Sequence, residues 1–372
     1  MKVAVVLGTR PEAIKLAPVI LSLRKMHNLA TLVVNSGQHR ELSVKALSAF
    51  GIVPDIDLTI MQPGQTIAEL TSRLFASLDR MLDTERPDWV IVQGDTSTAM
   101  VAAVTAFYRR IKVAHVEAGL RSFDIWAPFP EEANRVFVSH VATHSFAPTA
   151  LSRDNLLRLG VDESAITVTG NTVVDALRLL RPGLNGIELD AALGPAVMAD
   201  LEVYTPILVT SHRRESFGAG LDGICTALSE IAARFEDHAI IYPVHPNPNV
   251  REFVVQRLGG RPRIHLVEPL GYLELLAVMN RSTLILTDSG GIQEEAPSFG
   301  KPVLILRDVT ERPEVVEVGA GRLVGTDAQR IVAGTVELLS DAVAYARMAR
   351  AGNPFGDGFA AERIVDAITA SA

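Results

Sequence analysis

The chain of 372 residues has one cysteine, few aromatic residues and no surplus of positive charge. Because Cys225 is the only cysteine, an internal disulfide and a cysteine-rich metal site are both excluded. Lys and Arg number 35 against 43 Asp and Glu, which gives a net charge of −8. Nucleic-acid-binding proteins carry a basic footprint, so this class is disfavoured. Any anionic ligand must therefore be held by a local group of cations that works against the overall charge.

Long apolar runs and known cofactor or metal motifs are also lacking. No uncharged apolar run approaches the ~18 residues of a membrane span. Arg10, Glu12 and Lys15 interrupt the apolar stretch at the start of the chain, so we expect no signal peptide and a cytoplasmic protein. The nine histidines form no HExxH motif and no close His/Cys cluster, so we expect no metal site. Without a GxGxxG or Walker-type loop, dinucleotide redox chemistry and ATP hydrolysis have little support.

Short apolar runs alternate with longer segments of helical period along most of the chain. This alternation predicts an α/β protein with parallel sheets that are covered by helices on both faces. The length suggests two domains at about 150 residues each, and we expect two doubly wound, Rossmann-like domains that face a cleft. The strands are expected at residues 3–7, 29–35, 88–93, 112–116 and 143–146, and then at 207–210, 239–243, 263–267, 283–287 and 302–307.

A break in this alternation between Gly170 and Tyr204 predicts the domain boundary. The stretch includes Arg181-Pro182-Gly183 and an alanine-rich segment with little strand character. We therefore expect a first domain over residues 1–170 and a second over residues 171–357. The last segment, residues 358–372, is expected to form a helix that packs back on the first domain.

Unusual polar residues follow the predicted strands of both halves. In open α/β sheets, ligands bind outside the carboxyl ends of the strands. In the first half these residues are Arg10, Asp95 and Glu117, and in the second half they are His212, Asp288-Ser289-Gly290-Gly291 and Arg312. Two such edges facing each other would form one cleft.

Three carboxylates of the first half are candidates for proton transfer: Asp95, Glu117 and Glu131. Carboxylates clustered in a partly dry cleft raise one another's pKa, so that one can hold a proton while another accepts one. Each also has a structural alternative. Asp95 can cap the helix that follows it, Glu117 can pair with Arg121, and Glu131 can pair with Arg135 four residues further along a helix.

The segment Ser289-Gly290-Gly291 is a candidate for binding a diphosphate. It is expected to open a helix, where free N–H groups and the helix dipole attract anions and glycine allows close approach. A glutamate one turn later, Glu294 or Glu295, is placed to accept hydrogen bonds from ribose hydroxyls. The alternative is that Asp288 or Ser289 only caps the helix and that the glutamates complement its dipole.

Arg10, Lys15 and His212 have simpler readings as well. Arg10 and Lys15 lie at the start of a helix, where they can bind phosphate, but Arg10 can equally pair with Glu12 on the surface. His212 can equally be a core histidine near a strand end.

These residues stand in segments that resemble the non-hydrolysing bacterial UDP-N-acetylglucosamine 2-epimerases over nearly the whole chain. The segments that carry the resemblance are GTRPEAIKLAPV, QHRE, IMQPGQT, QGDTST, HVEAGLRS, PFPEEANR, TGNTVVDAL, SHRRESFG, YPVHPNPNVRE, LTDSGGIQEEAPS, GKPVL, RDVTERPE and NPFGDG.

The resemblance implies a two-domain, glycosyltransferase-B-like fold, a homodimer, and an active site between the domains. The implied reaction interconverts UDP-N-acetylglucosamine and UDP-N-acetylmannosamine by anti elimination of UDP to 2-acetamidoglucal and syn re-addition. No metal or redox cofactor takes part in this chemistry. The product would supply N-acetylmannosamine for the synthesis of cell-surface polysaccharides or related glycans.

The resemblance also implies roles for particular residues. Asp95, Glu117 and Glu131, with His212, are the implied catalytic residues; the implied UDP-sugar-binding residues are Arg10, Lys15, Asp95, Glu117, His212, Ser289, Gly290, Gly291, Glu295 and Arg312. Two departures from the family pattern stand out. Leu275 replaces a frequent Phe near the uracil, and Gln38-His39-Arg40 match only part of a regulatory site that some members have.

Three other activities compete with this interpretation. A hydrolysing relative would release UDP and free N-acetylmannosamine, a glycosyltransferase of the same fold would need an acceptor, and a UDP-sugar sensor would show no turnover. In deuterium oxide, deuterium at C2 of a nucleotide-linked mannosamine would support the non-hydrolysing epimerase, whereas stoichiometric free UDP would indicate the hydrolysing relative. The glycosyltransferase would show no C2 exchange without an acceptor.

Overall fold

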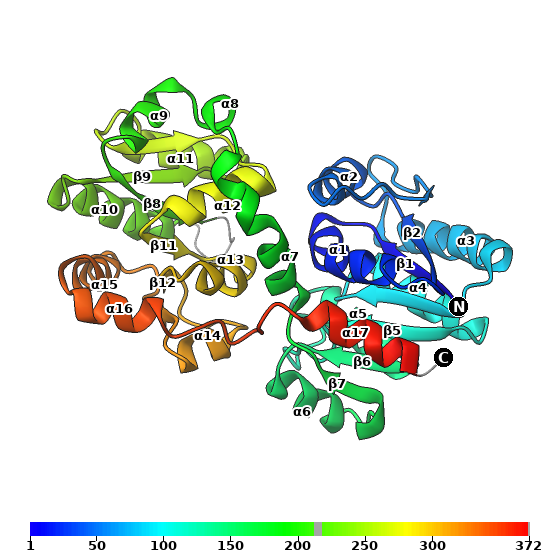
Figure 1. The fold of residues 1–372 in the computed structure, drawn as a ribbon. Coiled ribbons are helices and arrows are strands. Elements are labelled where there is room, and N and C mark those ends of the chain that lie inside the picture. Colours follow the sequence, from blue (N-terminus) through cyan, green and yellow to red (C-terminus); the bar gives the residue numbers. More distant parts are fainter. Residues whose placement is uncertain (212–217, 371–372) are drawn as a thin grey trace. The chain divides into compact units, whose positions relative to one another are not determined.

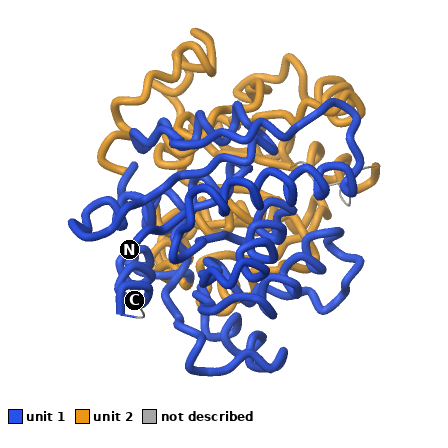
Figure 2. Tube along the Cα trace, turned by 90° about the vertical axis from the view of Figure 1, so that its right-hand side faces the viewer, with its two compact units in different colours: residues 1–180, 355–372 blue, residues 181–354 orange. Residues whose placement is uncertain are grey.

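The computed structural model describes residues 1–211 and 218–370, and these form two compact units. Unit 1 comprises Met1–Leu180 and Phe355–Ala372, and unit 2 comprises Arg181–Pro354. Figure 1 labels the helices and strands, and Figure 2 shows the two units in different colours. Each unit has its own parallel sheet with helices around it, so the predicted α/β fold with two doubly wound sheets is confirmed.

Unit 1 contains a sheet of seven strands in the order β3-β2-β1-β4-β5-β6-β7. All of its neighbouring strands pair in parallel. Its elements in chain order are β1 (Lys2–Leu7), α1 (Arg10–Arg24), β2 (Ala30–Asn35), α2 (Arg40–Ser48), β3 (Ile56–Asp57), α3 (Ile67–Glu85), β4 (Trp89–Gln93), α4 (Ser97–Tyr108), β5 (Lys112–Val116), α5 (Glu131–Val141), β6 (His144–Ala147), α6 (Ala150–Arg158), η1 (Glu163–Ala165), β7 (Ile166–Val168), α7 (Thr172–Leu180) and, at the end of the chain, α17 (Ala360–Ala370).

Unit 2 contains a sheet of six strands in the order β10-β9-β8-β11-β12-β13, again all parallel. Its elements are η2 (Arg181–Gly186), α8 (Asp190–Leu193), α9 (Pro195–Leu201), β8 (Thr205–Thr210), α10 (Ala219–Arg234), β9 (His238–Pro243), α11 (Pro248–Leu258), β10 (Ile264–Val267), α12 (Tyr272–Arg281), β11 (Leu284–Thr287), α13 (Gly290–Glu295), η4 (Ala296–Phe299), β12 (Val303–Ile305), α14 (Pro313–Glu317), β13 (Gly321–Leu323), α15 (Ala328–Ser340) and α16 (Ala342–Ala349).

Local sequence explains how helices α3 and α4 of unit 1 form. Thr66 caps α3 by accepting from the N–H of Glu69, whose carboxylate accepts from the N–H of Thr66 in return, a capping box. Leu70, Leu74 and Leu78 then recur at every fourth position and are all buried. Thr96 caps α4 by accepting from the N–H of Ala99. These caps place the first turns of α3 and α4 at the carboxyl edge of the sheet.

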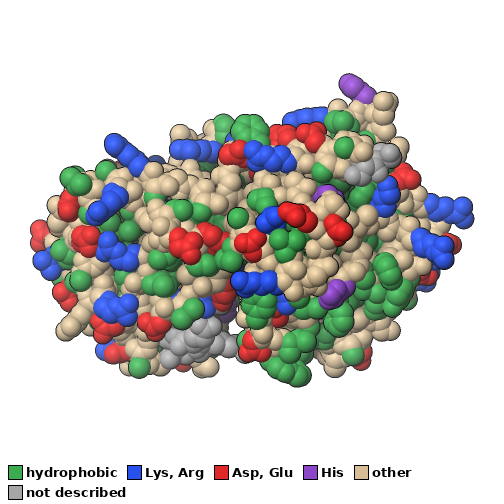
Figure 3. All heavy atoms as spheres, turned by 90° about the horizontal axis from the view of Figure 1, so that it is seen from below, with side chains coloured by type: hydrophobic (Ala, Val, Ile, Leu, Met, Phe, Trp, Pro, Cys, Tyr) green, Lys and Arg blue, Asp and Glu red, His purple; other side chains and the backbone are tan. Residues whose placement is uncertain are grey.

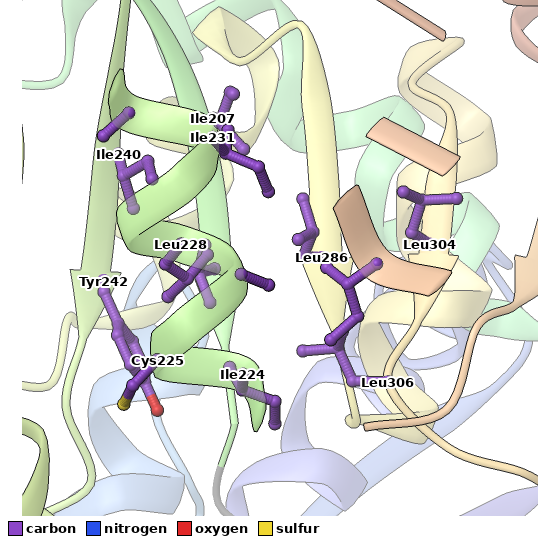
Figure 4. Packing of buried hydrophobic residues seen from close by; sticks show 14 of the residues in the cluster. Ile207, Ile224, Cys225, Leu228, Ile231, Ile240, Tyr242, Leu286, Leu304 and Leu306 are labelled. Atoms are coloured by element: carbon purple, nitrogen blue, oxygen red, sulfur yellow. The ribbon is translucent and has the colours of Figure 1, made fainter. Parts of the chain in front are cut away.

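The core of unit 2 lies between helix α10 and the strands of the second sheet (Figure 4). Ile224, Leu228 and Ile231 of α10 face Ile207 of β8 and Ile240 of β9, and all five side chains are almost fully buried. At ~25 cal/mol per Å² of apolar surface, each such side chain stabilises the fold by about 1.5–3 kcal/mol. This core holds the strand ends of unit 2 in place.

The expected strands are all present, but three further strands were missed. The missed strands are β3, β7 and β13, which have two or three residues each. They form by pairing at or near the margin of a sheet that already exists, and a run this short carries no readable alternation.

The chain returns from unit 2 to unit 1 at its end. Helix α17 packs against α1 and α7. Because α7 also packs against α1, the described unit 1 extends to Leu180, beyond the expected end at residue 170.

The surface carries charges of both signs. On the face drawn in Figure 3, Lys and Arg side chains are interspersed with Asp and Glu over most of the area. In the described part of the chain, no helix is long and apolar enough to cross a membrane.

Candidate active site

Glu117 follows β5 at the carboxyl edge of the first sheet, and nitrogen donors surround its side chain. Its Oε1 contacts the ammonium of Lys15 and accepts a hydrogen bond from Asn171 Nδ2 at 3.0 Å, while Gln93 Nε2 donates to Oε2. The side chain is only 6% exposed. A carboxylate with three donors and almost no water is held in one orientation as an acceptor.

The backbone of Glu117 adopts an uncommon conformation. Its φ is +61°, in the left-handed region that side chains other than glycine rarely adopt. Backbone strain of this kind is found at functional sites when the surroundings hold it. The structural alternative, a pair of Glu117 with Arg121, does not form, since Arg121 pairs with Glu132 at 2.7 Å instead.

Asp95 follows β4 and forms an ion pair with Arg135 of helix α5. Two guanidinium nitrogens of Arg135 lie 2.5 and 2.8 Å from Asp95 Oδ2, and Asn134 Nδ2 donates to the Asp95 carbonyl at 2.8 Å. Thr96, not Asp95, caps the next helix, so the structural alternative for Asp95 does not apply. The carboxylate keeps part of its surface exposed at the sheet edge.

Glu131, the first residue of α5, differs from both. Its side chain has no hydrogen bond or ion pair with any other described residue and is partly exposed. The structural alternative, a pair of Glu131 with Arg135, is absent from the described structure, because the neighbouring Glu132 turns inward and takes Arg121 and Arg135. Burial raises the pKa of Glu132, but the Ser122 N–H and the Arg121 guanidinium outweigh it, so the net pKa is lowered.

Glu12 of helix α1 links two loops of the same edge. Its Oε2 accepts from the N–H of Gly8 at 3.0 Å and from the N–H and hydroxyl of Thr9, each at 2.7 Å. Its Oε1 accepts from the Thr96 hydroxyl at 2.7 Å. Burial raises the pKa of Glu12 to about 7 despite these donors.

Arg10 is therefore left exposed at the first turn of α1, because Glu12 points inward instead of pairing with it. Since Glu12 occupies the N–H groups of Gly8 and Thr9, an anion near this turn would meet the guanidinium of Arg10. On β5, His115 is buried with its Nε2 2.8 Å from the Gly94 carbonyl, and burial lowers its pKa to about 4.

In unit 2, the segment Ser289-Gly290-Gly291 opens helix α13 at the carboxyl end of β11, as expected. The side chain of Ser289 makes no helix-cap hydrogen bond. The guanidinium of Arg312 lies over Gly290, where a Cβ would be 3.5 Å from its central carbon. The same guanidinium donates to Glu294 Oε1 at 2.7 Å. Arg312 therefore lies within van der Waals distance of the helix start and pairs with a glutamate of the same helix.

Glu295 and His212 complete the expected residues of unit 2. Glu295 is 7% exposed, and its Oε1 accepts from the hydroxyl of Tyr272 at 3.1 Å. His212 lies outside the described residues, as do Arg213 and Arg214. Within the described chain, no group of three or more His, Cys, Asp and Glu side chains is arranged to hold a metal ion.

Sequence reasoning missed several residues that surround the carboxylates. Gln93, Asn171, Glu12 and Glu132 were not singled out as partners of the site. Gln93 carries a readable signal, since it is the only polar residue of the buried strand β4. Asn171 has no local signal, because its contact with Glu117 spans 54 positions of the sequence.

Two doubly wound parallel sheets, each with polar residues at the carboxyl ends of its strands, define a glycosyltransferase-B-like α/β protein. The family pattern described as UDP-N-acetylglucosamine 2-epimerase matches residues 21–369. The chain belongs to this family.

Individual relatives agree with the family match. The chain is 51% identical to the UDP-N-acetylglucosamine 2-epimerase of Escherichia coli (strain K12), over 99% of this chain and 98% of the relative. It is similar to the crystal structure of UDP-GlcNAc 2-epimerase from Neisseria meningitidis bound to UDP-GlcNAc, with a TM-score of 0.90, 43% identity and full coverage of both chains. The Methanocaldococcus jannaschii enzyme in complex with UDP-GlcNAc and UDP has a TM-score of 0.82 and 38% identity, again over both whole chains.

Proposed function

We propose that this epimerase is of the non-hydrolysing kind and interconverts UDP-N-acetylglucosamine and UDP-N-acetylmannosamine. The observation that carries the proposal is the set of three carboxylates at one sheet edge in three different surroundings. Glu117 is buried among donors, Asp95 is paired with Arg135, and Glu131 has no side-chain partner among the described residues. Groups in such different surroundings suit different proton-transfer roles.

The proposed reaction begins with an anti elimination. A carboxylate removes the proton from C2 of the sugar, the C–H electron pair forms the C1–C2 double bond, and the C1–O bond breaks with its electron pair on the UDP diphosphate. The products are UDP and 2-acetamidoglucal. The C2 hydrogen is not acidic, so loss of the diphosphate accompanies its removal, and the ionised carboxylates stabilise positive charge at C1.

A syn re-addition then completes the epimerisation. A carboxylic acid returns a proton to C2 with the opposite configuration, and the diphosphate oxygen bonds to C1 again. Asp95, Glu117 and Glu131 together supply the base, the acid and the negative charge in this proposal. Atoms and electrons balance without an oxidant, so the proposed chemistry uses no cofactor.

The UDP moiety is assigned to Ser289-Gly290-Gly291, Glu295 and Arg312 of unit 2, with Arg10, Lys15 and His212 as further groups. Arg312 and the glycines are the candidates for the diphosphate, and Glu295 is the candidate for the ribose. Preorganised donors at a leaving group are worth about 3–4 kcal/mol each. The contact of Lys15 with Glu117 gives this lysine a second task in orienting the carboxylate.

Incubation with UDP-N-acetylglucosamine in deuterium oxide tests the proposal. A non-hydrolysing epimerase incorporates deuterium at C2 of both nucleotide-linked sugars, whereas a hydrolysing enzyme releases UDP and free N-acetylmannosamine in equal amounts. The variants Asp95→Asn, Glu117→Gln and Glu131→Gln should remain folded and lose exchange. Near-normal exchange in all three would show that the carboxylates are misassigned.

We also propose that the protein is a homodimer. The support is an apolar area at the end of α4 and on α5, where Phe107, Tyr108 and Phe137 are more than half exposed. Tyr108→Glu should convert a dimer into a monomer in analytical ultracentrifugation, whereas a monomeric wild-type protein would contradict the proposal.

A further inference from the structure

Two segments that the proposed function leaves without a role, TGNTVVDAL and NPFGDG, contact each other where the chain returns to unit 1 at Phe355. The N–H of Asn171 donates to the Phe355 carbonyl at 2.6 Å. Gly170 and Gly356 approach closely, because a Cβ on Gly170 would lie 3.3 Å from Gly356 Cα. Both glycines have positive φ, +91° and +138°. The backbone of residues 170–171 is thus fitted to the returning end of the chain.

The residues at the start of α17 make further hydrogen bonds to α7. Asp175 of α7 accepts from the N–H groups of Ala360 and Ala361 at 3.2 and 2.8 Å. Arg178 of α7 donates to the Gly358 carbonyl at 2.7 Å. Residues 355–361 are therefore tied to both the beginning and the middle of α7.

The side chain of Asn171 is oriented by its own helix. Its Oδ1 accepts from the N–H of Val173 at 3.0 Å, an Asx-type cap of α7. With the amide oxygen used in this way, the amide nitrogen must point to the other side, where it donates to Glu117 Oε1 at 3.0 Å. Asn171 is only 2% exposed, so water does not compete for this contact.

We propose that Asn171 is a positioning residue for the catalytic carboxylate of Glu117, and that residues 355–361 hold Asn171 in the orientation that this requires. The proposal rests on the proposed function, since it takes Glu117 as a catalytic group. It gives the return of the chain to unit 1 a role in catalysis in addition to its role in packing.

Asn171→Ser tests the proposal because it keeps a cap for helix α7 but removes the hydrogen bond that Asn171 donates to Glu117. Serine can still cap α7 with its hydroxyl, but it is too short to reach Glu117. We expect kcat for epimerisation to fall about 10- to 50-fold, while KM and the Kd for UDP stay within twofold. A value of kcat within twofold of wild type would overturn the proposal.

Asn155→Ser is the matched control. Asn155 is also a buried asparagine of unit 1, and its Nδ2 donates at 3.1 Å to the carbonyl of Gly119, two residues after Glu117. We expect this variant to lose thermal stability but to keep kcat within twofold. An equal loss of kcat in both variants would indicate a purely structural effect and overturn the proposal.

A double-mutant cycle of Asn171→Ser and Glu117→Gln measures whether Asn171 acts through Glu117, which a loss of stability alone would not produce. If Asn171 acts through Glu117, then Asn171→Ser should change the residual C2 exchange rate of Glu117→Gln by less than twofold. If Asn171→Ser lowers the C2 exchange rate by the same factor in the wild-type protein and in Glu117→Gln, the proposal is overturned.

Gly356→Ala tests the part played by the returning segment. Its Cβ would lie 3.3 Å from Gly170 Cα and 3.6 Å from the N of Asn171. We expect kcat to fall about fivefold with KM unchanged. Gly352→Ala is the control, since Gly352 also has positive φ but no atom within 4 Å of the added carbon, and it should keep its kcat. If both alanine variants keep kcat, the returning segment does not hold Asn171.

The wild-type protein in the same assays distinguishes the two proposals. Absence of C2 exchange in the wild type would overturn the proposed function and this inference together. Exchange in the wild type with a normal kcat for Asn171→Ser would overturn the positioning role alone.

Discussion

The two sheets of this chain have a common strand order around their first strand, but their carboxyl ends carry different chemistry. In unit 1 the first strand β1 lies between β2 and β4, and in unit 2 the first strand β8 lies between β9 and β11. At the edge of unit 1, buried carboxylates such as Glu12 and Glu117 are surrounded by donors. At the edge of unit 2, glycines and Arg312 lie at the start of a short helix.

The same strand order places different kinds of residue at the carboxyl edge of each sheet. The strand order brings corresponding loops to the carboxyl edge in each unit, because all strands of a sheet are parallel and the order in which they are added reverses at the first strand. In the proposed function, the residues in those loops decide between proton transfer in unit 1 and diphosphate binding in unit 2. We therefore expect variants of the unit 1 carboxylates to change kcat and variants of Arg312 and Tyr272 in unit 2 to change the affinity for UDP.

The largest effect is expected for Glu117→Gln in unit 1. If Glu117 is catalytic as proposed, its loss should lower kcat about 10³-fold, equivalent to about 4 kcal/mol, and leave the Kd for UDP within twofold. Steady-state kinetics and titration calorimetry with UDP measure the two quantities. Glu85→Gln, at the far end of α3, is the control and should keep both. If Glu117→Gln lost UDP affinity to a comparable extent, the proposed assignment of proton transfer to unit 1 and UDP binding to unit 2 would be wrong.

The next effect concerns pH and Glu12. Because burial raises the pKa of Glu12 to about 7 from 4.5, the folded chain keeps a proton that the unfolded chain releases. The stabilising effect of this proton is fully present below pH 4.5 and is lost as the pH rises to about 7. Over that window, the stability of wild type relative to Glu12→Gln should fall by about 3 kcal/mol.

Urea unfolding followed by tryptophan fluorescence measures this difference. The two tryptophans, Trp89 and Trp126, both lie in unit 1, so their signal reports on that unit. The lowered pKa of His115 gives an opposite slope between pH 4 and 6.5 in both proteins, and subtraction removes it. Glu252→Gln on the surface of unit 2 should leave the signal unchanged. A difference that is constant with pH would refute the burial effect.

A smaller effect is expected for Arg312→Gln in unit 2. Removing a charged donor from the diphosphate should raise the Kd for UDP about 10- to 30-fold, or about 1.5–2 kcal/mol. The value of kcat with saturating substrate should change less than the Kd does. Arg322→Gln, which breaks an exposed pair with Glu337 in the same unit, is the control. Unchanged UDP affinity in Arg312→Gln would remove this arginine from the proposed site.

The smallest effect is expected for Tyr272→Phe. This change removes the hydroxyl that donates to Glu295 Oε1, so the proposed ribose acceptor is held less firmly. The Kd for UDP should rise about three- to fivefold, or about 1 kcal/mol. Tyr345→Phe also removes a hydroxyl hydrogen bond in unit 2, to the Thr283 carbonyl, and should leave the Kd unchanged. Equal effects of the two variants would indicate loss of stability only.

Most of the fold could be predicted because long elements have strong local patterns. The buried strand β4 has an apolar run, and α3 has leucines at every fourth position. The edge strands β3, β7 and β13 could not be predicted, since two or three residues acquire strand conformation only from their neighbours.

The sequence suggested candidate residues for the site, but it did not predict the groups that surround them. Local spacing suggested the pairs Glu131–Arg135, Glu117–Arg121 and Arg10–Glu12, and none of these is present in the described structure. Spacing along a helix allows a pair to form, but the buried Glu132 takes Arg121 and Arg135 instead. Glu12 accepts hydrogen bonds from Gly8 and Thr9 instead of pairing with Arg10.

The sequence by itself determined the two parallel sheets, the carboxylates at the ends of their strands and the family to which the chain is similar. Only the tertiary structure decided which groups surround each carboxylate. Lys15, Gln93 and Asn171 are 102, 24 and 54 positions from Glu117, and the strand order and the return of the chain to unit 1 bring them together. The partners of a buried charge depend on how distant segments pack together, and this packing cannot be predicted from local sequence patterns.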